Sequence, residues 1–312
     1  MNGIELSEKF YLEYGKSMLE EKFPHLLPYI AVGISGSGSD SFGYDDEISR
    51  DHDYEAGFCV FLPGEDLVSR RDEFLLERAY SSLPKEFMGV KRNILDPVGG
   101  NRKGIIRFSD FFTQKTGAPD GNLTTAQWLE LDEFYLAEAT NGKVFFDGLG
   151  AFSAIREKLL NMPEDVRLKK IAGNLLTAAQ SGLYNYPRCV LRGEKAAAQL
   201  ALFEFVKSVL SVIFTFNKKY APYYKWIFKA YKALDKLNGF SAELEYLLSS
   251  PNDKTAFDKK TAIVNAVLDD VCAALNQTYS LSEKDPGKLA YLLNDLIVDP
   301  SLRNENLFIG AK

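Results

Sequence analysis

The sequence predicts a two-domain α+β/α protein, with an N-terminal mixed sheet and flanking helices followed by a C-terminal all-α helical bundle. In the first half, short apolar runs typical of buried strands alternate with stretches of helical periodicity. From about residue 151 onward only helical periodicity remains. The chain of 312 residues is long enough for two ordinary domains. We therefore expect an α/β domain at 1–150 and a helical domain at 151–312.

The N-terminal half begins with apolar residues at helical spacing, which end at Pro24. Short apolar runs after it predict strands, and charged amphipathic runs predict helices. In order, the expected elements are a helix at 5–23, strands at 31–34 and 51–62, a helix at 65–82, an irregular stretch at 85–103, a strand at 105–108, a helix at 128–139 and a strand at 144–147.

The C-terminal half contains long helical patterns whose only interior turn signals are isolated glycines. Pro187 suits the first turn of a helix and separates the first two patterns. The expected helices are 166–184, 188–216, 222–237, 241–249, 255–277 and 286–296.

A Gly/Ser-rich turn follows the first expected strand, and a flexible turn of this kind can wrap phosphates with its backbone N–H groups. The glycine spacing is that of a P-loop, but Ser39 stands where that motif requires lysine. The alternative is a polar surface loop without a binding function, since Gly and Ser clusters are common in loops. The candidate phosphate-binding residues here are Gly36, Ser37, Gly38 and Ser39.

Two carboxylates, Asp51 and Asp53, stand at the start of the next expected strand. Side chains at i and i+2 on a strand point to the same face, and Glu55 would continue that face. Hard oxygen ligands on one face suit Mg²⁺, which is usually shared with substrate phosphates. The pattern indicates metal-assisted phosphoryl or nucleotidyl chemistry.

At Gly38-Ser39, Gly43 and the Asp51-His52-Asp53 triplet, the sequence resembles the nucleotidyltransferase superfamily, which includes the DNA polymerase β type of palm. Over most of its length the chain also resembles DUF4037, a bacterial family of unassigned function that has a nucleotidyltransferase domain. The segments that carry this second resemblance are GYDDEISRDHD (43–53), GLYNYPRCVLRGE (182–194), NKKYAPYYKW (217–226) and DPSLRN (299–304).

The resemblance implies a nucleotidyltransferase-like fold and no known substrate. We expect a nucleoside triphosphate as substrate and Mg²⁺ or Mn²⁺ held by Asp51 and Asp53. Active superfamily members carry a third carboxylate on a later strand. Arg107 occupies that place in the strand expected at 105–108. Three other acids remain as candidates for the role, namely Glu55, Asp96 and Asp110.

Composition narrows the functional classes. A net charge of −6 argues against a protein that coats nucleic acid, although it leaves room for a local basic site. The three cysteines lie far apart and indicate neither a zinc site nor a disulfide, and Cys59 is expected to be buried packing. Two histidines make a Ser-His-Asp or Cys-His apparatus improbable.

We expect a soluble, cytoplasmic protein with no membrane partner. The N-terminus carries no signal-peptide pattern, and the most apolar stretch, 196–216, contains Glu204 and Lys207 and falls short of a clean membrane span.

Two basic segments are candidate contacts for nucleotide or acceptor. Arg188 and Arg192 share a helix face at i and i+4, and we expect Arg192 to contact the triphosphate. Ion pairing with the acidic α/β domain is the alternative for this pair. Lys218 and Lys225 belong to the lysine-rich run 217–236, in which Lys225, Lys229, Lys232 and Lys236 are expected to follow one helix face. A simply solvated face is the alternative there.

The sequence thus predicts a Mg²⁺-dependent nucleotidyltransferase that moves a nucleoside monophosphate from a nucleoside triphosphate to a hydroxyl acceptor and releases pyrophosphate. The acceptor could be a small molecule, a protein or an RNA end. One alternative is a catalytically degenerate nucleotide-binding or regulatory module, suggested by Arg107. Another is a tRNA-modifying toxin or defence protein, supported only by the lysine-rich run.

Overall fold

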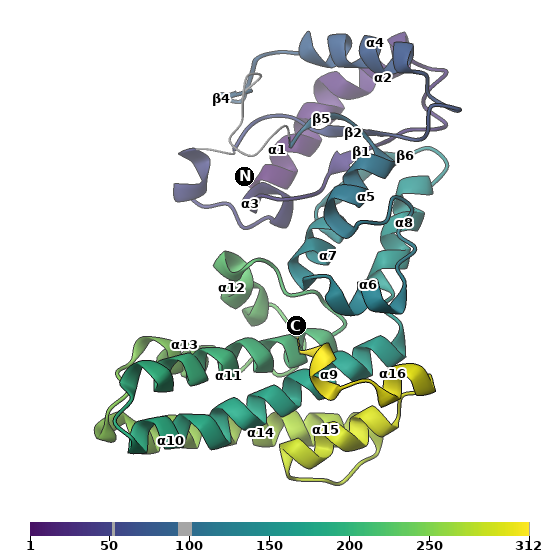
Figure 1. Cartoon of the computed structure of the whole chain (residues 1–312). Coiled ribbons are helices and arrows are strands. Elements are labelled where there is room, and N and C mark those ends of the chain that lie inside the picture. Colours follow the sequence, from purple (N-terminus) through teal and green to yellow (C-terminus); the bar gives the residue numbers. More distant parts are fainter. Residues whose placement is uncertain (52–53, 93–101, 312) are drawn as a thin grey trace. The chain divides into compact units, whose positions relative to one another are not determined.

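The computed structural model describes residues 1–51, 54–92 and 102–311, without the side chains of 50 and 51. The chain forms two compact units. The first unit is Met1–Leu123 with Phe134–Asn161, and the second is Thr124–Glu133 with Met162–Lys312. A four-stranded mixed sheet lies in the first unit, and the second is largely helical (Figure 1), so the predicted fold class is confirmed.

Helices precede, interrupt and follow the strands of the first unit. Its elements are α1 Gly3–Phe10, the π-helical turn η1 Tyr11–Gly15, α2 Lys16–Lys22, β1 Ala31–Ile34, α3 Ser39–Phe42, the 3₁₀ turn η2 Ile48–Asp51, β2 Cys59–Leu62, α4 Arg70–Ser81, β3 Glu86–Phe87, β4 Val90–Lys91, β5 Gly104–Arg107, α5 Phe108–Thr116, α7 Glu133–Thr140, β6 Lys143–Asp147 and α8 Ala151–Leu160. The short helix α6 Thr125–Glu130 lies between α5 and α7 in the sequence but belongs to the second unit.

The remaining elements belong to the second unit and are all helical. They are α9 Glu164–Ala178, the π-helical turn η3 Ala179–Asn185, α10 Tyr186–Leu191, α11 Lys195–Phe216, the 3₁₀ turn η4 Tyr224–Trp226, α12 Ile227–Lys232, α13 Ser241–Ser249, α14 Lys254–Tyr279, α15 Pro286–Asp295, α16 Pro300–Asn304 and the 3₁₀ turn η5 Leu307–Gly310.

The sheet has the strand order β5-β2-β1-β6, with β1 at its centre, antiparallel to both β2 and β6. β5 runs parallel to β2, and Cys59 pairs with Gly104. In β1 the register against β6 shifts between Val32 and Gly33. A Cβ on Gly33 would lie 2.5 Å from the carbonyl oxygen of Lys143, so this irregular pairing requires glycine.

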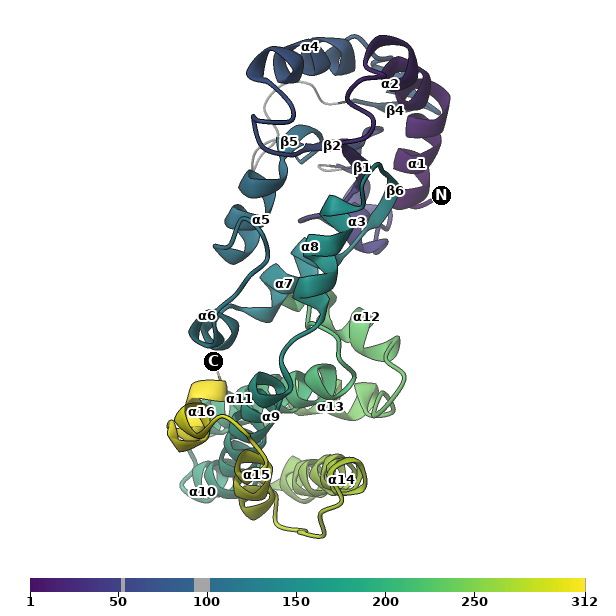
Figure 2. The same ribbon diagram turned by 90° about the vertical axis from the view of Figure 1, so that its right-hand side faces the viewer.

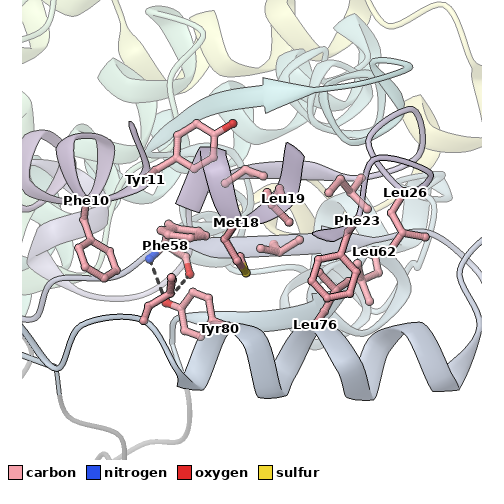
Figure 3. Packing of buried hydrophobic residues seen from close by; sticks show 14 of the residues in the cluster. Phe10, Tyr11, Met18, Leu19, Phe23, Leu26, Phe58, Leu62, Leu76 and Tyr80 are labelled. Atoms are coloured by element: carbon pink, nitrogen blue, oxygen red, sulfur yellow. Dashed lines mark hydrogen bonds between the residues drawn. The ribbon is translucent and has the colours of Figure 1, made fainter. Parts of the chain in front are cut away.

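One face of the sheet packs against α1, α2 and α4. Val60 and Leu62 of β2 point into this layer, together with side chains such as Phe10, Leu19 and Leu76 (Figure 3). At the edge of the layer, the Tyr80 hydroxyl donates to the Phe58 carbonyl at 2.8 Å and accepts from the Phe58 N–H at 3.1 Å (Figure 3).

The opposite face packs against α5 and α8, which Figure 2 shows close to the sheet. Phe61, which alternates with Val60 and Leu62, stacks on Phe152 of α8 at 4.0 Å between ring centroids. Phe111 and Phe112 of α5 also contact the Phe152 ring. The alternation of β2 therefore supplies two separate hydrophobic layers.

Both π-helical turns contain a glycine at a point of close packing. A Cβ on Gly15 would lie 2.4 Å from the Phe58 ring. A Cβ on Gly182 would lie 2.6 Å from Phe205 of α11. Glycine at these places lets a large ring approach the helix backbone.

The second unit is organised around α9 and α11. α11 carries twelve buried residues, including Leu202, Phe205 and Val209. Among the described residues, α11 is the one helix long and apolar enough to cross a membrane by length and composition, which differs from the expectation for 196–216. More than half of its most apolar stretch is buried within the protein, as in the core helix of a soluble protein.

The strand predicted at 51–62 is wrong for the described residues before Cys59. Asp51 ends the 3₁₀ turn η2, and the described residues 54–58 lie outside any strand. β1 ends at Ile34, and the Phe58 N–H donates to the Tyr80 hydroxyl rather than to a strand. The Phe58 carbonyl accepts from this hydroxyl at 2.8 Å and from the Gly104 N–H of β5 at 3.0 Å.

Three predicted helices of the second half, 166–184, 188–216 and 222–237, are also wrong in their limits. The chain stays helical from Glu164 to Leu191 through Pro187 and turns at Gly193, where φ is +79°. The helix predicted at 222–237 is reduced to η4 and α12, because the Tyr231 hydroxyl and Asn217 bind backbone groups beyond the end of α12.

Replacing Phe152 with Ala should lower the free energy of unfolding by about 3–5 kcal/mol, because it removes a fully buried ring and leaves a cavity. Urea unfolding measures the change. Phe74→Ala in the same unit is the control: this ring is 56% exposed, so its loss should cost less than about 1 kcal/mol. Equal costs for the two substitutions would contradict the packing described for α8.

Candidate functional site

The Gly/Ser turn after β1 borders a pocket of about 40 Å³, room for roughly three water molecules or one small anion. Gly36 and Ser37 line it together with the cationic residues Arg102 and Lys115. The other lining residues are Ser35, Cys59, Ile106, Phe111 and Gln114. Backbone turn and cations together make an anion site the natural interpretation.

The side-chain amide of Asn141 holds the turn in both directions. Its Oδ1 accepts the Gly36 N–H at 2.9 Å, and its Nδ2 donates to the Gly36 carbonyl at 2.7 Å. Gly36 has φ of +118°, a conformation that residues with side chains rarely adopt. Arg156 of α8 in turn donates to the carbonyls of Thr140 and Asn141. Because the Gly36 N–H already donates to Asn141, the backbone N–H groups that follow it are the ones that could bind a ligand.

A buried ion pair fixes the other end of the turn. Lys103 Nζ lies 2.9 Å from Asp40 Oδ2, and both side chains are 4% exposed. The same Nζ donates to the carbonyl of Glu55 at 2.7 Å. Lys103 therefore ties the turn, the segment before β2 and the start of β5 to one another.

The predicted phosphate-binding residues separate into two pairs. Gly36 and Ser37 line the pocket, whereas Gly38 and Ser39 do not. A Cβ on Gly38 would lie 2.6 Å from Asp40 Oδ1, so Gly38 is needed for this close approach. Cys59 is buried beside the turn, as predicted, and burial raises the pKa of its thiol to about 12. A thiol of this kind is inert as a nucleophile.

The predicted acids are only partly within the described structure. Asp53 lies outside the described residues, and of Asp51 the structure gives the backbone alone. Glu55 precedes β2 in a non-strand segment, so the alternation that placed it beside the other two does not hold. Among the described side chains, no group of three or more His, Cys, Asp or Glu is arranged to hold a metal.

The strand predicted to carry a third acid is present as β5, but it presents no acid to the pocket. Ile106 is the β5 side chain that lines the pocket, so Arg107 points to the opposite face. Its guanidinium binds Glu73 at 2.6 Å and the Pro63 carbonyl at 2.7 Å, a structural role. Asp110 is exposed in the first turn of α5, and Asp96 lies outside the described residues.

The predicted cations Arg188, Arg192, Lys218 and Lys225 all lie exposed on the second unit. Arg188 is in α10 and stacks over the Tyr184 ring at 3.8 Å, and Arg192 caps the end of α10. Arg188 and Arg192 therefore lie at the end of α10 and not, as predicted, at the start of the long helix α11. The contact of Arg192 with triphosphate stays a prediction.

The partly buried carboxylate of Glu133 anchors the loop that carries Lys218. Glu133 accepts from the Thr215 hydroxyl and from the Ala221 N–H, each at 3.3 Å. Desolvation raises the pKa of the Glu133 carboxyl, although the nearby Lys170 lowers it. This residue therefore positions the loop between α11 and η4.

Residues 128–227 match the family model "Domain of unknown function (DUF4037)", so a DUF4037 domain lies in this part of the chain. The match contains the segments 182–194 and 217–226, but neither 43–53 nor 299–304, and it is shorter than the resemblance suggested. No curated protein and no solved structure matches the chain.

Sequence reasoning missed the residues that build and brace the pocket: Arg102, Lys115, Asp40, Lys103 and Asn141. Two local signals were present. Asp40 directly follows the turn, and Arg102-Lys103 directly precedes a predicted strand. Lys115 and Asn141 reach the turn only through the tertiary fold, because α5 and the end of α7 pack beside it.

Replacing Lys103 with Met should lower the free energy of unfolding by about 3–5 kcal/mol, because it leaves Asp40 buried without its cation. Adding Asp40→Asn removes that charge and should recover part of the loss. Urea unfolding of the single and double variants measures both effects, with the exposed Lys91→Met as control. A double variant no more stable than Lys103→Met would contradict the pairing.

The raised pKa of Glu133 predicts a pH dependence. Above its ordinary value of 4.5 and below the raised pKa, only the folded protein keeps the proton. Stability should therefore fall as the pH rises through this window. The Tm of the wild type, measured against Glu133→Gln at each pH, should decline from about pH 4.5 upward. A constant Tm difference between the two proteins would show that the pKa is not raised.

Proposed function

We propose that the first unit binds a nucleoside triphosphate at the Gly/Ser turn and transfers its nucleoside monophosphate to a hydroxyl acceptor, with pyrophosphate as the leaving product. One observation carries the proposal: the turn at Gly36 and Ser37 lines a pocket that also contains Arg102 and Lys115. The glycine-rich backbone suits phosphate oxygens, and Arg is a bidentate donor to phosphate.

Within this pocket the residues have different roles. Lys115 is paired with Glu138 at 2.6 Å, which partly offsets its charge. Arg102 is the second cation that lines the pocket, and its guanidinium is the group we assign to a terminal phosphate. Ser37 is the hydroxyl of the turn that lines the same space. Held this way, the triphosphate would present its α-phosphate away from the turn, toward an acceptor.

The proposal assigns Mg²⁺ or Mn²⁺ to Asp51 and Asp53. Such an ion, when bound, would neutralise charge on the phosphates. The described acid beside the turn, Asp40, is already neutralised by Lys103 and is not a suitable ligand. The described part of the chain thus adds no ligand of its own, and the metal assignment rests on the sequence.

A second candidate is a nucleotide-binding module that forms no product. The observation that favours it is β5, where Ile106 lines the pocket and Arg107 is engaged with Glu73. With no acid at this place, nothing on β5 can take the proton from an acceptor hydroxyl. Nucleotide binding is common to both candidates, and product formation separates them.

Arg102→Gln should weaken nucleoside triphosphate affinity about 10- to 100-fold, because it removes charge-assisted hydrogen bonds to phosphate. Calorimetric titration of the four NTPs with and without Mg²⁺ measures it. The exposed Arg71→Gln in α4 is the matched control and should leave the affinity unchanged. The Asp51→Asn/Asp53→Asn variant should lose only the part of the affinity that depends on Mg²⁺.

The outcomes separate the candidates. Transfer of label from an α-labelled NTP that disappears in Asp53→Asn supports the transferase, and transfer that survives this change refutes its assigned acids. Binding without transfer supports the module. An affinity equal in Arg102→Gln and the wild type rules out the turn pocket as the phosphate site.

A further inference from the structure

The segment 217–236 of the second unit concentrates positive charge on an acidic protein. It contains six lysines and a single acid, Asp235, whereas the whole chain has a net charge of −6. All six lysines are exposed: Lys218, Lys219, Lys225, Lys229, Lys232 and Lys236.

Two of the six lysines lie over aromatic rings, and a third pairs with a carboxylate. Lys236 Nζ lies 5.3 Å from the centroid of the Phe216 ring, and Lys229 Nζ lies 5.9 Å from that of Trp226. Lys232 is paired with Glu245 at 3.1 Å. Six lysines against one acid give the segment a local positive charge, and a ring attracts a cation without neutralising it.

Two tyrosines lie exposed within the same segment. Tyr223 and Tyr224 are 41% and 69% exposed, and their ring centroids are 4.2 Å apart. Tyr223 caps the 3₁₀ turn η4 and Tyr224 begins it, and η4 leads into α12 (Figure 1). The two rings thus form an exposed aromatic pair next to Lys225.

The backbone of the segment is held in place without any ligand. Asn217 accepts the Lys236 N–H and donates to the Lys236 carbonyl, both at 3.0 Å, so the two ends of the segment are joined. Glu133 fixes the loop at Ala221. A preorganised surface loses little conformational entropy when a ligand binds.

We propose that residues 217–236 form a contact surface for a single-stranded nucleic acid, with lysines on the phosphates and Tyr224 stacked on a base. Lysines beside exposed aromatic rings are the combination that such strands require. A duplex hides the faces of its bases, and an acidic protein or an anionic membrane would need the lysines alone. The surface is independent of the nucleotide pocket in the first unit, and it stands if that pocket binds no nucleotide.

The test is fluorescence anisotropy of a labelled 12-nucleotide oligouridine RNA, and of the matching oligothymidine DNA, at several KCl concentrations. Tyr224→Ala should weaken binding about 5- to 150-fold, because one base loses its stacking partner. Lys218→Gln with Lys225→Gln should reduce the slope of log K against log salt by about 0.7 for each lysine. Comparing the affinities for the RNA and for the DNA shows whether the surface prefers ribose or deoxyribose.

Matched substitutions elsewhere on the second unit are the controls. Tyr291→Ala and Lys284→Gln alter exposed residues outside the segment and should leave the affinity unchanged. Arg102→Gln should also leave it unchanged, which separates this proposal from the nucleotide site.

Three results would overturn the proposal. One is no binding of either oligonucleotide at about 50 mM salt, where phosphate contacts are strong. Another is equal binding of polyphosphate or duplex that Tyr224→Ala does not weaken, which indicates a general polyanion surface. The third is binding to anionic lipid vesicles, lost in the lysine variant, by a protein that does not bind the oligonucleotides.

Discussion

The arrangement of the candidate site depends on the buried ion pair between Asp40 and Lys103. One ammonium group, 4% exposed, holds the carboxylate that follows the Gly/Ser turn and the Glu55 carbonyl that precedes β2. Lys103 itself stands directly before β5, so three separate segments converge on one charge. Burying two charges costs desolvation free energy, and their mutual attraction offsets this cost only when the geometry of the pair is excellent. The ion pair thus restricts the conformation of a turn whose glycines would otherwise leave it flexible.

The other side of the turn is fixed by a different device. The Asn141 amide binds both backbone groups of Gly36, and Arg156 holds the carbonyl of Asn141 itself. The turn is therefore clamped between a neutral amide on one side and a buried ion pair on the other. Arg102, and Lys115 in its pair with Glu138, are the cations that line the pocket. Preorganised donors of this kind need no rearrangement when phosphate binds, which is the basis of both functions considered for the first unit.

The fold class follows from patterns that are local in the sequence. The apolar runs at 31–34 and 59–62 are strands because their side chains can be buried on both faces, and the helical periodicity after residue 151 is strong. The strand predicted to begin at Asp51 failed because strand length depends on partners, and β1 offers none beyond Ile34. The same limit applies to the pocket. Its turn was visible in the sequence, whereas Asn141 and Lys115 reach that turn through packing that no local pattern encodes.

The central claim, that the clamped turn is a phosphate site, is tested most directly by a crystal structure of the protein with Mg²⁺ and a non-hydrolysable nucleoside triphosphate. The account predicts terminal phosphate oxygens within about 2.7–3.2 Å of donors on Ser37 and Arg102. It also predicts that the Asp40–Lys103 pair and the Asn141 hydrogen bonds to Gly36 remain in place. A nucleotide bound elsewhere, with the turn pocket holding only water, would contradict the account.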